Sequence, residues 1–252
     1  MFSIAFGLAT FVLLSAAALT ALYFHTRLPN HQLNKETHDA VKVGVGMVVI
    51  LSALLLGLLI ASVKGTFDTA ARDLKRFATQ IVVLDHTLRA YGPQADPARS
   101  LIRQYTEQAL AGTWPSDNEP EVVDDPRAEQ LLYQLQDAIL ALAPETSRQR
   151  SFSDEMKGEV RRLIELRWTL VEEATTSLNV PLVTVLVIWL AVVFASFGYN
   201  VPRNPLVVTT FLLCAASVGA ALFLIIQMDR PFEGLIKISP APLRSALAQI
   251  RE

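Results

Sequence analysis

The sequence has a single cysteine, Cys214, among its 252 residues. One cysteine cannot build a disulfide framework within the chain, and it offers no set of thiolate ligands for a metal. A glycine-rich phosphate-binding loop and a nucleophile elbow are also missing. We therefore predict no enzyme activity, no catalytic residue, no metal, no cofactor and no nucleic-acid partner.

Charge is missing from four long stretches of the chain. The stretches without Lys, Arg, Asp or Glu are Met1–Thr26, Val43–Val63, Ala174–Pro202 and Asn204–Met228. Each holds about 20 apolar residues, enough for a helix rising about 1.5 Å per residue to cross a hydrocarbon core of about 30 Å. The pattern predicts four transmembrane helices in contact with membrane lipid. Because the first stretch has no basic leader and is longer than a signal-peptide core, a retained helix is favoured over a cleaved signal.

Basic residues are unevenly distributed between the two sides of these predicted spans. One side has Lys64, Arg72, Lys75, Arg76, Arg161, Arg162, Arg167, Arg230, Lys237 and Arg244, and the other has Arg27, Lys35, Lys42 and Arg203. By the positive-inside rule the richer side is cytoplasmic. We expect a multi-pass protein of the inner (plasma) membrane with both termini in the cytoplasm.

The order of segments predicts an all-α integral membrane protein. Residues 1–63 form a first transmembrane hairpin, 64–180 a cytoplasmic helical bundle, 181–228 a second transmembrane hairpin and 229–252 a cytoplasmic C-terminal segment. Apolar residues from Phe67 to Tyr91 follow alternating steps of three and four, which is a heptad stripe. The second transmembrane helix should therefore continue into the bundle as one rod, and the third should continue from it, because no Gly-rich linker intervenes. The stripe serves either assembly or packing within the subunit.

Two Asp-Pro pairs mark helix starts inside the bundle. Asp96 precedes Pro97, and Asp125 precedes Pro126. Each aspartate is predicted to be an N-cap, with proline at the first helical position. A last bundle helix is expected from about Thr146.

The histidines and clustered acids are weak metal candidates. His25, His31 and His38 match no standard spacing of metal ligands. The acids Asp117, Glu119, Glu121, Asp124 and Asp125 lack the ligand order of an EF-hand loop. Solvated polar loops are the favoured interpretation of both sets.

The second transmembrane helix carries small residues at every fourth position. Ala53, Gly57 and Ala61 would let another helix approach closely, and we predict that they pack against one.

A neighbouring face of the same helix combines apolar and hydroxyl side chains. Its members are Ser52, Leu55, Leu59, Ser62 and Thr66. Apolar side chains in a narrow channel gate by dewetting, and weak dipoles leave ions free to move, so these residues are candidates for a pore lining. Ordinary helix packing, with each serine bonded to its own backbone, is the alternative. Because no ionisable group lies well inside any span, a proton- or sodium-coupled transporter is disfavoured.

Three segments carry a resemblance to a known family. They are "LPNHQLNKETHDAVKVGVGMVVILSALLLGLLIASVKGTFD" (Leu28 to Asp68), "WLAVVFASFGYNVPRNP" (Trp189 to Pro205) and "MDRPFEGLIKISPAPLRSAL" (Met228 to Leu247). The set resembles the bestrophin-like domain family of bacterial membrane proteins. That family is distantly similar to bestrophins, which are pentameric anion channels with two membrane hairpins per subunit. The resemblance implies a homo-oligomer, a pentamer by analogy, and an inorganic anion such as chloride.

Part of the bestrophin pattern is present and part is missing. "RPFEG", Arg230 to Gly234, is similar to the Asn-Pro-Phe-Gly segment after the last membrane helix of bestrophins, matching at Pro231 and Phe232. The acidic run of the calcium clasp in animal bestrophins is replaced by "LIKIS". The resemblance implies that the hydrophobic neck of those channels corresponds loosely to Leu55 and Leu59, without its phenylalanines.

The chain leaves its fourth apolar stretch through Asp229, Arg230, Pro231, Phe232 and Gly234. We expect Asp229 and Arg230 to meet water, with the arginine beside the unpaired carbonyls of the helix end. Pro231 stops the helix, and Phe232 is expected to fold back into the interfacial layer of the membrane. Residues from Leu235 onwards should pack on the bundle.

Two hypotheses of function follow. The first is an oligomeric ion channel, anion-conducting, whose pore is lined by the second transmembrane helix. The alternative is a non-conducting membrane scaffold or sensor whose cytoplasmic bundle binds a partner.

Overall fold

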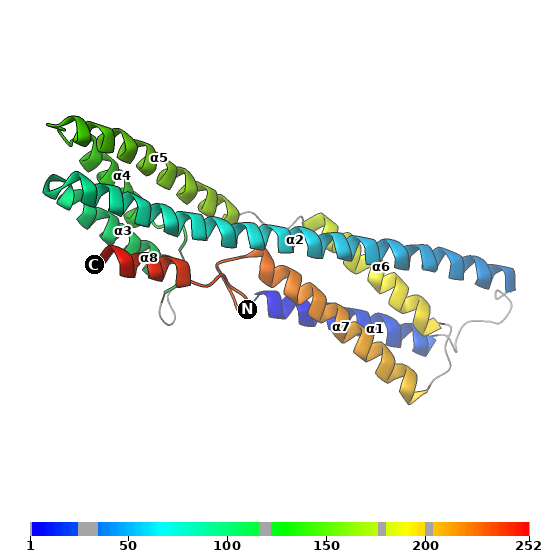
Figure 1. Cartoon of the computed structure of the whole chain (residues 1–252). Coiled ribbons are helices and arrows are strands. Elements are labelled where there is room, and N and C mark those ends of the chain that lie inside the picture. Colours follow the sequence, from blue (N-terminus) through cyan, green and yellow to red (C-terminus); the bar gives the residue numbers. More distant parts are fainter. Residues whose placement is uncertain (1, 25–34, 116–121, 176–179, 200–203, 252) are drawn as a thin grey trace. The chain divides into compact units, whose positions relative to one another are not determined.

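The computed structural model describes residues 2–24, 35–115, 122–175, 180–199 and 204–251. Every element in these ranges is a helix (Figure 1). The helices are α1 (Phe2–Phe24), α2 (Lys35–Tyr91), the short 3-10 helix η3 (Pro93–Ala95), α3 (Asp96–Thr113), α4 (Pro126–Leu140), α5 (Ser147–Thr175), α6 (Val180–Tyr199), α7 (Pro205–Asp229) and α8 (Ala241–Arg251). The predicted all-α class is confirmed.

The chain divides into two compact units. Unit 1 comprises Met1–Gly65 and Ser177–Asp229, and unit 2 comprises Thr66–Thr176 and Arg230–Glu252. Four helical stretches are long and apolar enough to cross a membrane, namely Ser3–Tyr23, Asp39–Tyr91, Ser147–Gly198 and Pro205–Asp229. They overlap the four charge-free stretches, and their apolar portions lie in unit 1.

In unit 1, α1 packs against both α6 and α7 through glycines (Figure 1). A Cβ added to Gly198 of α6 would lie 2.2 Å from the carbonyl oxygen of Ala18. A Cβ added to Gly219 of α7 would lie 2.9 Å from the carbonyl oxygen of Gly7. Neither position leaves room for a side chain, so backbone approach sets both helix crossings.

Unit 2 is a bundle built around the heptad stripe of α2. Seven stripe residues are buried in its core, namely Ala70, Leu74, Phe77, Ile81, Leu84, Leu88 and Tyr91. They pack with α3, α4, α5 and α8, so the stripe is used within the subunit. Helix α2 ends at Tyr91, and Gly92 follows with a φ of 116°, a conformation that favours glycine.

The two predicted N-caps have different outcomes. Asp125 caps α4, and its side chain accepts a hydrogen bond of 2.9 Å from the backbone N–H of Arg127. The prediction for Asp96 is wrong, because Asp96 is the first residue of α3 and Ala95 is the N-cap. Helix η3 runs directly into α3, so Asp96 is already helical and its backbone N–H bonds to the oxygen of Pro93.

Candidate functional site

The five pore-lining candidates on α2 divide between buried and exposed positions. Ser52 and Leu59 are only 3% and 5% exposed. Leu55 is half-buried, and both leucines belong to an apolar cluster with residues of α6 and α7. Ser62 and Thr66 are exposed. Within one chain, therefore, the part of the predicted pore-lining face that holds Leu55 and Leu59 packs against the chain's own helices.

The predicted packing stripe of α2 is exposed. Ala53, Gly57 and Ala61 all lie on the surface of unit 1. A Cβ added to Gly57 would have nothing within 4 Å, in contrast to Gly198 and Gly219. Helix packing against this stripe stays a prediction, and it would need a surface outside the described chain.

A third face of α2 presents large apolar side chains. Ile50, Leu54 and Leu58 are 69%, 60% and 59% exposed. They are four residues apart and therefore share one side of the helix. We missed this face in the sequence, because a helix that is apolar all round gives no sign of which side its own subunit covers.

The segment after α7 packs against the rest of unit 2. Pro231 and Phe232 are buried, and the Phe232 ring meets the edge of Trp114 with centroids 5.9 Å apart. Trp114 donates a hydrogen bond of 2.9 Å from Nε1 to the carbonyl oxygen of Ile238, whose own N–H donates to the oxygen of Pro231 at 2.8 Å. The expectation of Phe232 in the interfacial layer is wrong. Trp114 gives the ring an aromatic partner inside a larger apolar core.

The charged residues of the motif are half-buried or exposed. Asp229 is the last residue of α7, and Arg230 pairs with Glu233 at 2.9 Å, with both side chains about half exposed. Gly234 has a φ of 82°. A glycine is suited to this position because a Cβ would strain the turn.

Unit 2 also holds acids that sequence reasoning missed. Glu159 is 7% exposed and accepts a hydrogen bond of 3.1 Å from Thr87, while its second carboxylate oxygen has no partner among the described residues. Burial raises the pKa of Glu159. Burial, and next the nearby Asp73 carboxylate, raise the pKa of Glu173 to about 7. No sequence signal marks these residues, because their partners on α2 are distant in the chain.

The structure describes only some of the candidate metal ligands. His25 and His31, with Asp117, Glu119 and Glu121, lie outside the described residues, as does the side chain of His38. Asp124 pairs with Arg167 at 2.9 Å. In the part of the chain that the structure describes, no group of three or more His, Cys, Asp or Glu side chains is placed to hold a metal ion.

A match to a family model identifies the family to which this chain belongs. The model of the bestrophin-like domain matches residues 12–243. The chain belongs to the bestrophin-like domain family. The predicted resemblance is thus confirmed, and the chain is a membrane protein of this family.

Solved structures agree with this membership of the bestrophin-like family. One is a variant of a bacterial bestrophin homologue from Klebsiella pneumoniae, with a TM-score of 0.73 and 13% identity, covering 97% of this chain and 95% of the other. Another structure of a bacterial bestrophin homologue from Klebsiella pneumoniae, phased on zinc, has a TM-score of 0.69 and 11% identity over 96% of each chain. At these identities the likeness shows the bestrophin-like fold alone. Comparison with curated proteins finds no match.

Proposed function

We propose that the protein is an oligomeric ion channel that conducts small inorganic anions such as chloride, with α2 lining the pore. The observation that carries this proposal is the apolar surface of α2 that its own subunit leaves uncovered. A helix that packs on α6 and α7 by one side has two other sides available for neighbouring subunits and a conduit.

The exposure of α2 refines which residues would line the pore. Leu54 and Leu58 are exposed, and Ser62 follows Leu58 at the next helical turn. Leucines at the narrowest point would gate by dewetting, and a serine hydroxyl would give a weak dipole without holding the ion. The stripe of Ala53, Gly57 and Ala61 would meet the α2 helix of the next subunit. This arrangement moves the proposed neck from Leu55 and Leu59 by one residue around the helix.

The rest of the proposal concerns topology and assembly. Each subunit would form two hairpins in the inner membrane, with both termini in the cytoplasm. Bestrophins assemble as pentamers, so we propose a ring in which five α2 helices surround the axis. The four charge-free stretches lack acids and bases alike, so the proposed anion selectivity rests on the similarity to bestrophins.

Cysteine accessibility tests the pore face. Cys214 is first replaced by alanine, because it is exposed on α7. In this background, Leu58→Cys and Ser62→Cys should react with a small charged thiol reagent in proteoliposomes, whereas the adjacent buried Leu59→Cys should not. Inert cysteines at both Leu58 and Ser62 would place this face against lipid and refute the proposed lining.

Chloride flux tests conduction itself. Purified protein in liposomes should carry chloride, and Leu58→Trp should reduce the flux because a larger side chain narrows the pore. Leu140→Trp is the matched control, since Leu140 is 56% exposed on α4 of unit 2. A ring that passes no ion tested would favour the scaffold alternative.

A further inference from the structure

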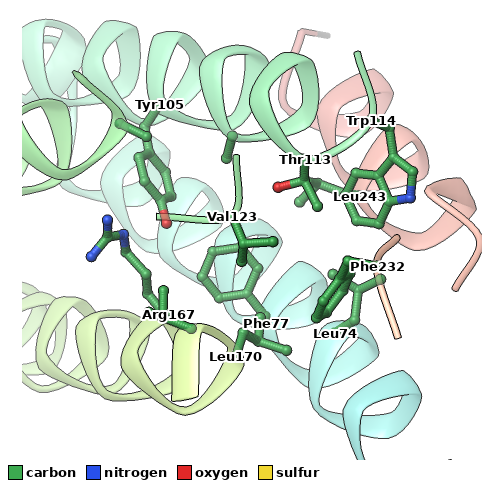
Figure 2. Close-up of a pocket in the computed structure, with 13 residues that line it drawn as sticks. Leu74, Phe77, Tyr105, Thr113, Trp114, Val123, Arg167, Leu170, Phe232 and Leu243 are labelled. Carbon is green, nitrogen blue, oxygen red and sulfur yellow. The ribbon is translucent and has the colours of Figure 1, made fainter. Parts of the chain in front are cut away.

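Unit 2 contains a partly open cavity of about 40 Å³ between α2, α3, α5 and the segment that follows α7. Its lining is largely apolar and aromatic, as Figure 2 shows. The apolar lining includes Leu74, Phe77, Trp114, Leu170 and Phe232. Three polar side chains, Tyr105, Thr113 and Arg167, also line it. An apolar core therefore encloses one permanent positive charge and two hydroxyl groups.

The Arg167 guanidinium has N–H donors beyond the one that contacts Asp124. Arg167 is 5% exposed, and one guanidinium nitrogen lies 2.9 Å from Oδ1 of Asp124. The guanidinium carbon lies 5.2 Å from the ring centroid of Trp168. A guanidinium has five N–H donors, so a single contact with Asp124 leaves others for a second acceptor. Because the Asp124 side chain is 53% exposed, water weakens its attraction for the buried cation.

A second donor faces the same space. Tyr105 is 1% exposed, and its hydroxyl oxygen points toward Arg167 (Figure 2). Burial raises the pKa of this hydroxyl, while Arg167 opposes the rise, so the group keeps its proton at neutral pH and can donate it. A buried hydroxyl without an acceptor costs about 1–3 kcal/mol. A carboxylate in the cavity would accept a hydrogen bond from the Tyr105 hydroxyl and so satisfy it.

We propose that this cavity binds a small monocarboxylate anion, with its carboxylate between Arg167 and Tyr105 and its short alkyl group among the apolar side chains. One water needs roughly 10–15 Å³ of such space, so the cavity holds about three to four non-hydrogen atoms. That is the size of acetate, and propionate would fit after a small side-chain movement.

The lining favours a carboxylate over other anions. Two coplanar oxygens match the fork of a guanidinium, and the alkyl group covers apolar surface. Chloride would leave the apolar lining uncovered. Phosphate carries more negative charge than one partly neutralised arginine can offset in a buried site.

A ligand bound in the cavity would also affect the packing of the segment that follows α7. Phe232 lines the cavity and packs on Trp114, which holds the carbonyl of Ile238. A bound carboxylate would therefore stabilise the packing of this segment against the rest of unit 2. This inference does not depend on conduction, since binding is measured without any flux.

The experiment uses the full chain in lipid nanodiscs, with empty nanodiscs as the blank. Acetate and propionate are titrated by calorimetry, and contact of their methyl groups with the protein is followed by saturation-transfer NMR. We expect binding that Arg167→Gln weakens by about tenfold or more, the loss of one charge-assisted pair. Tyr105→Phe should weaken binding by a smaller factor. Arg161→Gln, on the exposed side of the same helix, should change nothing.

One variant should strengthen binding, which keeps the test informative if Arg167→Gln does not fold. Asp124→Asn removes the carboxylate that competes for Arg167 and should raise the affinity for propionate. Absence of saturation transfer and heat for both acids, or equal binding in the Arg167→Gln and parent proteins, would overturn the site. Equal binding of chloride or phosphate would overturn the carboxylate class. A protein that carries no chloride but binds propionate would refute the channel and leave this site standing.

Discussion

The two units of the chain are both helical, yet they pack by different means. Unit 1 brings helices together at glycines, where Gly198 meets the backbone of Ala18 and Gly219 meets the backbone of Gly7. Unit 2 buries large side chains such as Leu84 and Ile81, which are fully enclosed. Lipid is as apolar as leucine, so a membrane helix gains little from burying leucine and more from close backbone contact. A bundle in water gains from every apolar side chain that it encloses.

Gly198→Val adds a side chain at the contact between α1 and α6 in unit 1. It should have the largest effect on stability. The added side chain would collide with the backbone of Ala18, which cannot move aside as a side chain can. We expect a loss at or above the upper end of the overpacking range, about 3 kcal/mol, seen as little folded protein in detergent. Gly57→Val is the control, since nothing lies within 4 Å of that position. It should leave the chain folded, and under the proposed assembly it should alter only the particle mass. Similar stability of the two variants would contradict the glycine contact.

Leu84→Ala tests the large-side-chain packing of unit 2. Removing this buried side chain should lower the free energy of unfolding by about 2–5 kcal/mol. Leu54→Ala changes the same atoms in unit 1, where the side chain is 60% exposed, and should cost less than about 0.5 kcal/mol within a subunit. Thermal unfolding followed by tryptophan fluorescence measures both. Equal losses would mean that the units do not differ as described.

Trp114→Phe refines the picture of unit 2 by separating apolar contact from hydrogen bonding. Phenylalanine keeps a ring beside Phe232 but leaves the buried carbonyl of Ile238 without its donor. The expected loss is about 1–3 kcal/mol. Trp168→Phe, at a position 44% exposed, should change the midpoint of thermal unfolding less. Limited proteolysis after residue 230 would show whether the C-terminal segment has come loose.

The smallest expected effect is a pH dependence confined to unit 2. The pKa of Glu173 is raised from 4.5 to about 7, so between these values the folded protein binds more protons than the unfolded protein. Stability contributed by this group is present below pH 4.5 and is lost as the pH rises through about 7.

Glu173→Gln should flatten this dependence, while Glu165→Gln, an exposed acid on the same helix, should not. The midpoint of thermal unfolding across this pH range measures it. A steeper dependence in Glu173→Gln would contradict the assignment.

Much of this contrast is visible in the sequence. The charge-free stretches predict where apolar helices lie, and the heptad stripe from Phe67 to Tyr91 predicts the core of unit 2. Both signals are local periodicities. The orientation of α2 in unit 1 was not predictable, because leucines face both its own subunit and the outside. Phe232 could not be placed either, since its partner Trp114 is remote in sequence and follows a helix end that reads as a loop.

The cavity residues Tyr105 and Arg167 could not be predicted as neighbours from the sequence either. No motif marks Tyr105, and Arg167 is predicted only as one of the basic residues of one membrane side. Their shared position depends on the packing of α3 against α5, which no spacing in the sequence encodes. Asp96 fails as an N-cap for a local reason, because η3 supplies the helical turn before it.

Unit 2 is assembled from two stretches of chain with the helices α6 and α7 between them. Its core includes Phe232, Leu243 and Ile250, all from the later stretch. During synthesis the ribosome therefore makes most of the bundle before α6 and α7, and the side chains that complete the core are made last. Until residues 230–251 have been made, Trp114 lacks its aromatic partner Phe232 and the core of unit 2 is incomplete.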